Sequence, residues 1–318
     1  MPPFAVDLAD IQEAAQRLAG RAHCTPVMTC ATLDRMAGRS LFFKCEQLQK
    51  TGAFKFRGAC NAVMRLTPET ASRGVVTHSS GNHAQALSLA AALRGIPAHV
   101  VMPRNASPVK RRAVEKYGGH VIECEPTLAA REKTAAAVLA ETGATMVPPY
   151  NHPDVIAGQG TVALELLEQA PQLDAVVVPV GGGGLMAGVA IAAKARAPQV
   201  RLFAAEPAGA DDAARSKAAG KLIPQTDPRT IADGLRTSLG ELTWPVLRDW
   251  VERVLTVTEE EIVAAMRLSW ERGKFLIEPS AAVAVAAVLG DAFRALQGLH
   301  RVGIVLSGGN VNLDDLPW

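Results

Sequence analysis

The strongest constraint on the fold is a repeated passage from a short β-branched run into a long helix-like segment. GVVTHSS is followed by GNHAQALSLAAALRG, AHVVMP by PVKRRAVEKYG, and HVIEC by TLAAREKTAAAVLAETG. Strand followed by helix, repeated in this way, predicts a parallel sheet covered by helices on both faces. The alternation resumes at DAVVVPV, RLFAAEP and VGIVLSG, so the sequence predicts two α/β units.

Three further segments carry their own start and stop signals. DLADIQEAAQRLAG predicts a first helix with Asp7 as its N-cap and Gly20 placed to end it. LFFKCEQLQ predicts a strand, and the KTGAFKFRGACNAVMRL that follows becomes helical in its latter part, so Lys55 is expected at a loop-to-helix junction. Thr258 and Glu261 form a capping-box pattern at the start of another helix.

The length of the chain allows two packed lobes. A domain takes about 100–200 residues, and this chain has 318, of which 48% are hydrophobic and 4% aromatic, as in a globular α/β protein. We expect residues 1–50 and 150–318 to form a larger lobe and residues 51–149 a smaller, mobile one. Lys55 then lies near the junction of the two lobes.

Charge and hydropathy exclude two classes of partner. Lys plus Arg total 33 and Asp plus Glu total 31, with the signs interspersed, so no basic block predicts binding to nucleic acid. Residues 175–193 carry no charge, but Pro179 and a run of glycines interrupt them, which predicts a strand, loop and helix and not a membrane span. The N-terminal MPPFAVDLAD has acidic residues where a secretory signal needs basic ones.

The cysteines indicate a reducing compartment. They are odd in number and show no CxxC or paired spacing, unlike a disulfide framework or a zinc site. We therefore expect reduced thiols and a cytoplasmic protein. The residues are Cys24, Cys30, Cys45, Cys60 and Cys124.

The glycine run Gly181 to Gly184 is the first candidate binding site. It follows a buried strand and precedes LMAGVAIAAKA, so its unblocked amides can bind an anion at a helix N-terminus. A flexible linker or a tight packing turn is the alternative. The run lacks both GxGxxG and the Lys-Ser/Thr ending of a P-loop, so a phosphate group smaller than NAD or ATP is the ligand it suggests.

Two more turns of this kind occur, in VVTHSSGNH and IVLSGGN, and the carboxyl ends of parallel strands are where open α/β sheets bind ligands. Ser79 and Ser80, with Asn82, open a helix, so hydroxyls and amides there suit a substrate carboxylate as well as an N-cap. His83 is more often a packing histidine in such a position, and we carry it only as a neighbour of the carboxylate site.

Lys55 lies between Phe54 and Phe56. A partly desolvated ammonium has a lowered pKa, as an amine needs in order to form an imine and to act as a base. Taken alone, a lysine near a helix start is usually solvated surface. The remaining motifs must therefore decide its role.

Seven ordered runs resemble one enzyme family. They are KTGAFKFRGACNAV, SSGNHAQALSLAA, VPVGGGGLMAGVA, AAEPAGADD, IADGL, IEPSAAVAVAAVL and VLSGGNV. In this order, and over roughly residues 5–316, the chain is similar to the serine racemase and threonine dehydratase family of fold-type II pyridoxal-phosphate (PLP) enzymes. The resemblance implies two open parallel-sheet lobes with helices on both faces and PLP in the cleft between them.

The resemblance also implies the residues that hold the cofactor. Lys55 resembles the Schiff-base lysine, Phe54 the residue packed by the pyridine ring, and Asn82 the partner of the 3′-oxygen. Ser307 resembles the hydroxyl at the pyridine nitrogen; a neutral serine leaves the ring a weaker electron sink, which favours loss of a β-hydroxyl. The implied phosphate loop comprises Gly181, Gly182, Gly183, Gly184 and Leu185.

The implied activity is loss of water from a small β-hydroxy amino acid. L-serine or L-threonine would give a 2-oxo acid and ammonia, with Lys55 removing the Cα proton. Ser80 resembles the serine that reprotonates Cα from the opposite face in racemases of the family, so serine racemisation is expected as a side reaction. The substrate partner is an amino acid, and the protein is expected to be a homodimer.

A divalent cation is also implied by the resemblance. Glu206 and Asp212 resemble its side-chain ligands, and the residue matching Ala210 contributes a backbone carbonyl. Oxygen ligands of this kind suit Mg²⁺ or Ca²⁺, with Mn²⁺ as a further choice. Without the resemblance, an acidic surface turn is the simpler interpretation.

Two alternative functions and one departure stay open. A 3-hydroxyaspartate dehydratase would need a cation for a second carboxylate, for which Arg131 and His152 are candidates. A non-catalytic small-molecule binding protein on the same fold is the third choice. Tyr150 stands where, as we align it, members of the family that respond to ATP carry an asparagine near the nucleotide site, so activation by ATP is in doubt.

Overall fold

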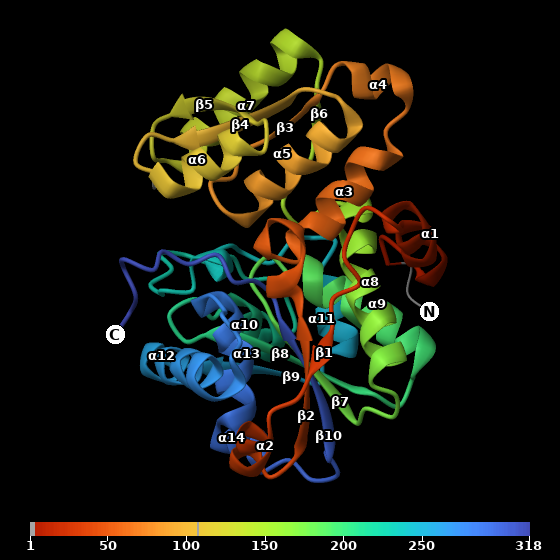
Figure 1. Ribbon diagram of the computed structural model, residues 1–318, viewed down its shortest axis with the longest axis vertical. Helices are drawn as coiled ribbons and strands as arrows, with labels where there is room; N and C mark the ends of the chain where they lie inside the picture. The colour runs from red at the N-terminus through yellow and green to blue at the C-terminus, as the bar shows by residue number, and fades with distance from the viewer. Residues whose placement is uncertain (1–3, 107) are drawn as a thin grey trace.

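The computed structural model describes residues 4–106 and 108–318. Two lobes, each built around one sheet, lie one above the other in Figure 1. The strands of the smaller sheet lie between residues 75 and 146, and those of the larger sheet lie outside that range. We call these the smaller and the larger lobe.

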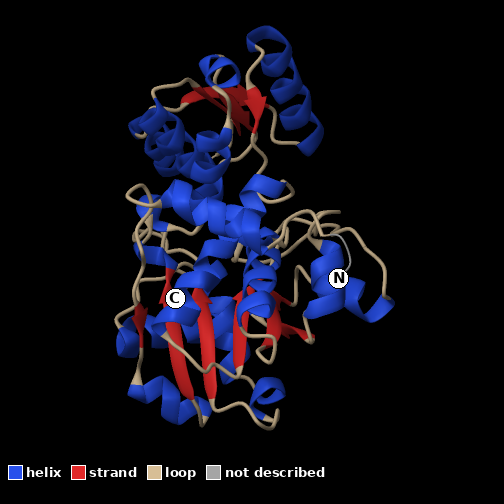
Figure 2. Ribbon diagram, turned by 90° about the vertical axis from the view of Figure 1, so that its right-hand side faces the viewer, coloured by secondary structure: helices blue, strands red, loops and turns tan. Residues whose placement is uncertain are grey.

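The larger sheet has the strand order β1-β2-β10-β7-β8-β9, and Figure 2 shows several of its strands side by side. Its pairs are parallel except for the edge pair β1–β2, which is antiparallel. The strands are β1 Val27–Met28, β2 Ser40–Cys45, β7 Ala175–Pro179, β8 Arg201–Pro207, β9 Arg253–Val257 and β10 Arg301–Leu306.

The smaller sheet has the order β5-β4-β3-β6 and is parallel throughout. The predicted α/β class with parallel sheets is confirmed. The pattern did not predict β1, β6 or β9; two of these have only two residues, too few to show a period. The strands are β3 Val75–Thr77, β4 Ala98–Pro103, β5 His120–Cys124 and β6 Thr145–Met146.

Helices cover both faces of the larger sheet. Residues of α2, α12 and α13 pack with one face, and residues of α8, α9 and α11 pack with the other. The helices of this lobe are α1 Leu8–Leu18, α2 Ala31–Ala37, α8 Pro153–Gln169, α9 Gly184–Arg196, α10 Asp212–Ala219, α11 Trp244–Trp250, α12 Glu259–Leu268, α13 Pro279–Leu289 and α14 Asp291–Arg294.

The smaller sheet is also covered on both faces. Side chains of α7 pack with one face, while those of α5 and α6 pack with the other. The remaining helices are α3 Lys55–Arg65, α4 Pro68–Ser72, α5 Asn82–Arg94, α6 Pro108–Lys116 and α7 Leu128–Thr142. Short 3₁₀ turns occupy Glu46–Leu48, Lys50–Gly52 and Asp233–Leu235, and a π-turn occupies Ser269–Gly273.

Local signals placed several helix ends correctly. The side chain of Asp7 caps α1 as predicted, and Gly20 follows the helix end with a φ of 72°. Thr258 and Glu261 form the predicted capping box of α12. The strand predicted in LFFKCEQLQ stops earlier, at Cys45, because the next residue, Glu46, turns its carboxylate into a buried ion pair.

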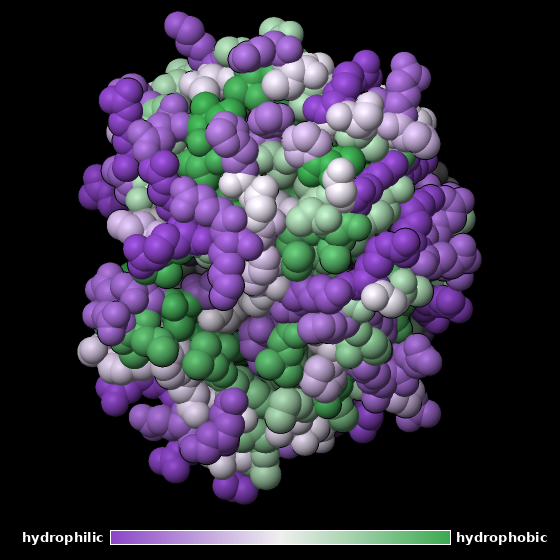
Figure 3. Space-filling view, turned by 45° about the horizontal axis from the view of Figure 1, so that its top comes forward, coloured by the Kyte–Doolittle hydropathy of each residue, from purple (hydrophilic) through white to green (hydrophobic). Residues whose placement is uncertain are grey.

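The uncharged stretch of residues 175–193 forms β7, the glycine loop and most of α9, as predicted. Among the described residues, no helix is both long and apolar enough to cross a membrane. Hydrophilic and hydrophobic residues are interspersed over the face shown in Figure 3. The five cysteines are free thiols in the structure.

Helix α8, which the pattern did not predict, connects the parts of the molecule that carry the candidate site. A Cβ added at Gly158 of α8 would lie 2.6 Å from the Cα of Gly58 on α3. A Cβ added at Gly188 of α9 would lie 2.5 Å from the amide nitrogen of Gly160 on α8. These glycines let α8 pack closely against α3 and α9, the helices that begin at Lys55 and at the glycine loop.

Candidate active site

Lys55 is the first residue of α3, as predicted. The segment before it pairs with the end of β10: Ala53 forms a β-bridge with Gly308, and the Phe54 N–H donates to the Ser307 carbonyl at 3.0 Å. Ser307 is 3% exposed. This pairing brings the amine of α3 and the carboxyl end of β10 into one site.

The Lys55 side chain is held by the backbone and by an aromatic ring. Its Nζ donates to the Pro149 carbonyl at 2.7 Å and lies 5.0 Å from the centroid of the Phe54 ring. Burial lowers the pKa of Lys55 to about 8, against the opposing charge of Glu278. At pH 7, about a tenth of this amine is therefore unprotonated and able to act as a nucleophile or base, far more than for a lysine with its ordinary pKa.

The glycine loop joins β7 to α9 and is buried. No side chain caps α9, and the N–H groups of residues 181–185 have no hydrogen-bond acceptor among the described residues. Buried N–H groups are normally paired. A helix N-terminus with several free amides is a binding site for an anion such as a phosphate.

Tyr150 and Thr243 both contact the glycine loop. A Cβ at Gly182 would lie 2.3 Å from Cγ of the Tyr150 ring, and the Thr243 hydroxyl donates to the Gly182 carbonyl at 2.9 Å. Burial raises the pKa of Tyr150. Tyr150, which the alignment put near a nucleotide site, thus packs on the candidate phosphate loop.

Asn82, the first residue of α5, lies in a polar cluster that sequence reasoning missed. Its Nδ2 donates to both carboxylate oxygens of Glu278, at 2.9 and 3.1 Å, and its Oδ1 accepts from Nδ2 of Asn310 at 2.9 Å. Burial raises the pKa of Glu278 to about 7, and the charge of Asp233 adds to the effect. The sequence offered one signal for this cluster: Glu278 is the only charged residue in the run IEPSAAV.

The chain shares its fold and motifs with enzymes of known class. Residues 7–308 match the family model described as pyridoxal-phosphate dependent enzyme. The chain belongs to this family. It is 56% identical to the serine racemase of Arabidopsis thaliana over 316 residues, which cover 98% of this chain and 96% of the relative.

Two solved structures of this pyridoxal-phosphate dependent enzyme family extend the comparison. The structure of maize serine racemase matches with a TM-score of 0.97 and 52% identity, covering 98% of this chain and 95% of that one. The threonine deaminase of T.th. matches with a TM-score of 0.92 and 43% identity, covering 98% of this chain and 100% of that one. The fold-type II resemblance inferred from the motifs is thereby confirmed.

The residues at the site fit the cofactor of this family. PLP needs an amine for covalent attachment and an anion site for its phosphate. The structure provides a buried amine with a pKa of about 8 and a buried loop with free amides. When PLP is bound, it supplies an electron sink for negative charge at the substrate Cα.

The turn before α5 has free polar groups at the position predicted for the substrate carboxylate. No side chain caps α5. Ser79 Oγ accepts a long hydrogen bond, 3.5 Å, from the N–H of Gly81, which precedes the helix, so the N-cap explanation of these serines is not supported. Ser79 and Ser80 are partly exposed. Both hydroxyls therefore remain available to an anion at this helix N-terminus.

His83 has the packing role that the sequence favoured, and its place as a neighbour of the carboxylate site stays a prediction. It is buried, and its Nε2 donates to the Val147 carbonyl at 2.8 Å. Burial, together with the charge of Lys55, lowers its pKa to about 3. The ring is therefore neutral and offers no positive charge to a carboxylate.

The structure distinguishes the two residues predicted to supply a cation for a second substrate carboxylate. His152 caps α8, because its Nδ1 accepts from the Asp154 N–H at 3.2 Å. Since that nitrogen is occupied as an acceptor, the prediction that His152 supplies a cation is not supported. Burial lowers the pKa of His78, and the nearby charge of Arg131 on α7 lowers it further. His78 directly precedes Ser79, so Arg131 lies near the turn predicted to bind the substrate carboxylate.

Glu206, Ala210 and Asp212 lie at the end of β8 and the start of α10, and all three are buried. The Glu206 carboxylate accepts from the amides of Ala213 and Ala214 at 3.2 and 2.6 Å, and Asp212 Oδ2 accepts from Leu239 at 2.8 Å. Asp212 Oδ1 is buried without a partner among the described residues. The acidic-surface-turn interpretation is therefore wrong, because these carboxylates are not on the surface.

Glu278 makes the stability of the cofactor-free protein depend on pH. Its pKa is raised from 4.5 to about 7 in the fold, so the folded state binds the proton more strongly than the unfolded state does. The stability that this proton provides is complete below pH 4.5 and is lost as the pH rises to about 7, a loss of about 3 kcal/mol of unfolding free energy. We expect Glu278→Gln to remove this part of the pH dependence, as measured by urea unfolding at pH 5 and pH 8.

Glu271→Gln is the control for this prediction, since Glu271 is largely exposed, in a weak surface pair with Arg267. It should unfold with the same pH dependence as the wild type. A Glu278→Gln variant that keeps the full wild-type difference between pH 5 and pH 8 would contradict the prediction.

Proposed function

We propose that the protein acts at Cα of serine, interconverting the two enantiomers and also eliminating water, after which hydrolysis of the unsaturated product takes up water and gives a 2-oxo acid and ammonia. The observation that carries the proposal is the Lys55 amine, with a pKa of about 8, in one site with the free amides of the glycine loop. The relatives named serine racemase and threonine deaminase support both reactions, because both begin with loss of the Cα proton.

The residues around Lys55 divide between binding the cofactor and moving the Cα proton in this proposal. Lys55 would hold the cofactor covalently, and its amine takes the proton from the substrate Cα. The amides of residues 181–185 would bind the phosphate, Asn82 would bind the 3′-oxygen, and Phe54 would pack against the ring. Ser307 would face the pyridine nitrogen, where a neutral hydroxyl would not hold a proton on the ring.

The turn before α5 binds the substrate. Ser79, together with the uncapped amides and Asn82, receives the carboxylate at the positive end of the helix dipole. Ser80 gives a proton to the face of Cα opposite Lys55. Racemisation needs both residues, whereas elimination needs a base on one face only, so the two reactions share a first step and then diverge.

A substrate panel tests the proposal. We expect D-serine and keto acid to form from L-serine, with smaller amounts of keto acid from L-threonine, when each is measured by chiral chromatography and a coupled dehydrogenase assay. Arg131 is the residue that would favour a second carboxylate. Activity confined to 3-hydroxyaspartate would therefore replace the serine proposal, and absence of any turnover with bound PLP would favour a binding protein.

We propose that Glu206, Asp212 and the carbonyl of Ala210 bind Mg²⁺, or Ca²⁺ or Mn²⁺ in its place. Two buried carboxylates, one with an unpartnered oxygen, form a donor set that suits a hard cation. No group of three or more acidic, histidine or cysteine side chains that could hold a metal occurs in the described residues, so backbone carbonyls and water would complete the site.

Mg²⁺ should stabilise the wild-type protein and not the Asp212→Asn variant. A ligand at a hundredfold excess over its Kd adds about 2.7 kcal/mol to the unfolding free energy, which raises Tm by about 4 °C in a chain of this size. Thermal unfolding with Mg²⁺ and with chelator measures the shift. Asp211→Asn is the matched control, because Asp211 pairs with Arg215 instead. An unchanged Tm in the wild type would remove the metal from the site.

We propose that the protein is a cytoplasmic homodimer. Free thiols agree with a reducing compartment. Large apolar side chains are exposed on and near the β1–β2 edge and in the C-terminal segment, and such surface is commonly buried between subunits. They are Met28, Met36, Leu48, Leu276, Leu313 and Trp318.

A further inference from the structure

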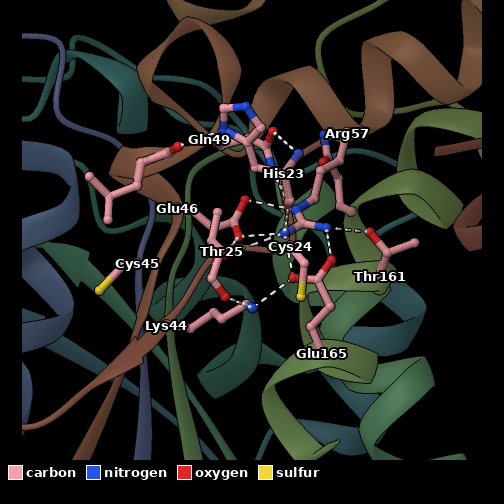
Figure 4. A network of polar contacts seen from close by, with 12 residues as sticks. His23, Cys24, Thr25, Lys44, Cys45, Glu46, Gln49, Arg57, Thr161 and Glu165 are labelled. Carbon is pink, nitrogen blue, oxygen red and sulfur yellow. Dashed lines mark hydrogen bonds and ion pairs between the residues drawn. The ribbon is translucent and has the colours of Figure 1, made fainter. Parts of the chain in front are cut away.

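A buried ion network is centred on the helix that begins at the proposed cofactor lysine. Arg57, two residues after Lys55 on α3, is 1% exposed and faces two carboxylates (Figure 4). Its Nε and Nη2 donate to the two oxygens of Glu46, both at 2.8 Å. Its Nη1 and Nη2 donate to the two oxygens of Glu165 at 2.6 and 2.8 Å. Arg57 therefore makes two forked ion pairs.

The network continues beyond these pairs and is balanced in charge. Lys44 Nζ donates to Glu165 at 2.7 Å and to the Thr25 carbonyl at 2.6 Å, and the Thr25 hydroxyl donates to Glu46 at 2.5 Å. Burial opposes the charge on Arg57, but Glu46 and Glu165 raise its pKa above the ordinary value, so it remains charged. Two cations thus face two carboxylates in a largely buried cluster.

The partners of Arg57 belong to the larger lobe. Glu46 follows β2 of the larger sheet, and Glu165 lies on α8. Helix α3 also packs against α5 of the smaller lobe, through Phe56, Ala59 and Leu87 among others. The Arg57 network therefore ties the first turn of α3 to the larger lobe, although this helix, including Phe56 in the same turn, also contacts the smaller one.

This attachment matters because two other parts of the candidate cofactor site, the glycine loop and Ser307, are also in the larger lobe. The glycine loop follows β7 and Ser307 follows β10, both strands of the larger sheet. If α3 moved with the smaller sheet, Lys55 would move relative to both. Burying charges costs solvation energy that an apolar cluster would not, but a forked guanidinium pair fixes orientation more sharply than apolar contacts do.

We propose that Arg57 is a positioning residue, which, with Glu46 and Glu165, clamps the first turn of α3 to the larger lobe and so holds the Lys55 amine at the cofactor site. The inference rests on the proposed function, because it assigns a role toward the same cofactor lysine. It goes beyond that function in naming the residues that keep Lys55 in place independently of the smaller sheet.

The test measures PLP uptake by the cofactor-free protein as a function of pH, followed by the visible absorption of the bound cofactor. Lysine has no planar fork, so Arg57→Lys keeps the charge and loses the paired bonds. The first turn of α3 then loosens and water reaches Lys55. We expect uptake at pH 8 to slow about tenfold and its midpoint to rise by about one pH unit, toward the ordinary lysine pKa.

A second variant and a matched control separate positioning from general stability. Glu165→Gln weakens the network at a partly exposed carboxylate while Glu46 still pairs with Arg57, and it should show the same changes to a smaller degree. Arg65→Gln removes the exposed pair with Asp154 at the far end of the same helix. It should leave both the uptake rate and the midpoint at their wild-type values.

Hydrogen exchange of the cofactor-free protein gives an independent readout. Amides in the first turn of α3 should exchange faster in Arg57→Lys than in Arg65→Gln. Wild-type uptake rates and midpoints in both network variants would overturn the inference and leave the proposed function intact. If Arg57→Lys does not fold, Glu165→Gln alone decides the matter. A wild-type protein that takes up no PLP would overturn the proposed function, and the inference with it.

Discussion

Lys55→Ala is expected to abolish the visible absorption of the covalently bound cofactor and to reduce both D-serine and keto-acid formation by about a thousandfold or more. The variant loses the nucleophile that attaches the cofactor and the base that removes the Cα proton. The Lys55 amine contacts the Pro149 carbonyl and the Phe54 ring, and the methyl group of alanine can be neither a nucleophile nor a base there. Spectroscopy and both product assays measure the loss.

Lys50→Ala is the matched control for this variant. Lys50 lies five residues earlier and also places its ammonium over an aromatic ring, 5.8 Å from the centroid of Phe56. It should keep the absorption band and both activities. Catalysis by Lys55→Ala at rates near those of Lys50→Ala would contradict the assignment of Lys55.

Ser80→Ala is expected to separate the two reactions. Loss of a positioned proton donor lowers the rate of the step that it serves by about a hundredfold or more. Racemisation needs a proton on the face of Cα opposite Lys55, whereas elimination of water from L-serine does not. D-serine formation should therefore fall by that factor while keto acid still forms from L-serine, and the ratio of the two products measures the effect.

Ser79→Ala provides the comparison for Ser80→Ala. Ser79 lies in the same turn but is assigned to the substrate carboxylate, so its loss should raise KM for both reactions and leave the product ratio near the wild-type value. A Ser80→Ala variant that loses elimination as strongly as racemisation would show that Ser80 binds substrate and is not the second proton donor.

Most of the fold could be predicted because its signals are local. Period-two and period-3.6 patterns, capping residues and glycine turns are read within a few residues, and they placed β7, β10, α1 and α12 correctly. Helix α8 escaped notice because it is largely buried through its first three turns and shows no polar face there. The two-residue strands β1 and β6 exist only because a neighbouring strand pairs with them.

The parts of the candidate site that carry local signals could also be predicted from the sequence. Lys55, the glycine loop and the serine turn could be found from the sequence, because each lies where a strand or loop passes into a helix and such junctions leave amides and side chains free. The division into lobes at residues 51 and 149 stays a prediction, and the attachment of α3 to α8 bears directly on where that boundary lies.

The tertiary structure alone decided the environment of these residues. Asn82 meets Glu278 across 196 positions, and Arg57 meets Glu165 across 108. No local pattern encodes such pairs, because either partner alone looks like an ordinary surface residue. The lowered pKa of Lys55 has the same origin: a lysine has its ordinary pKa in any unfolded chain, and only the packing of the two lobes removes the water that would keep it charged.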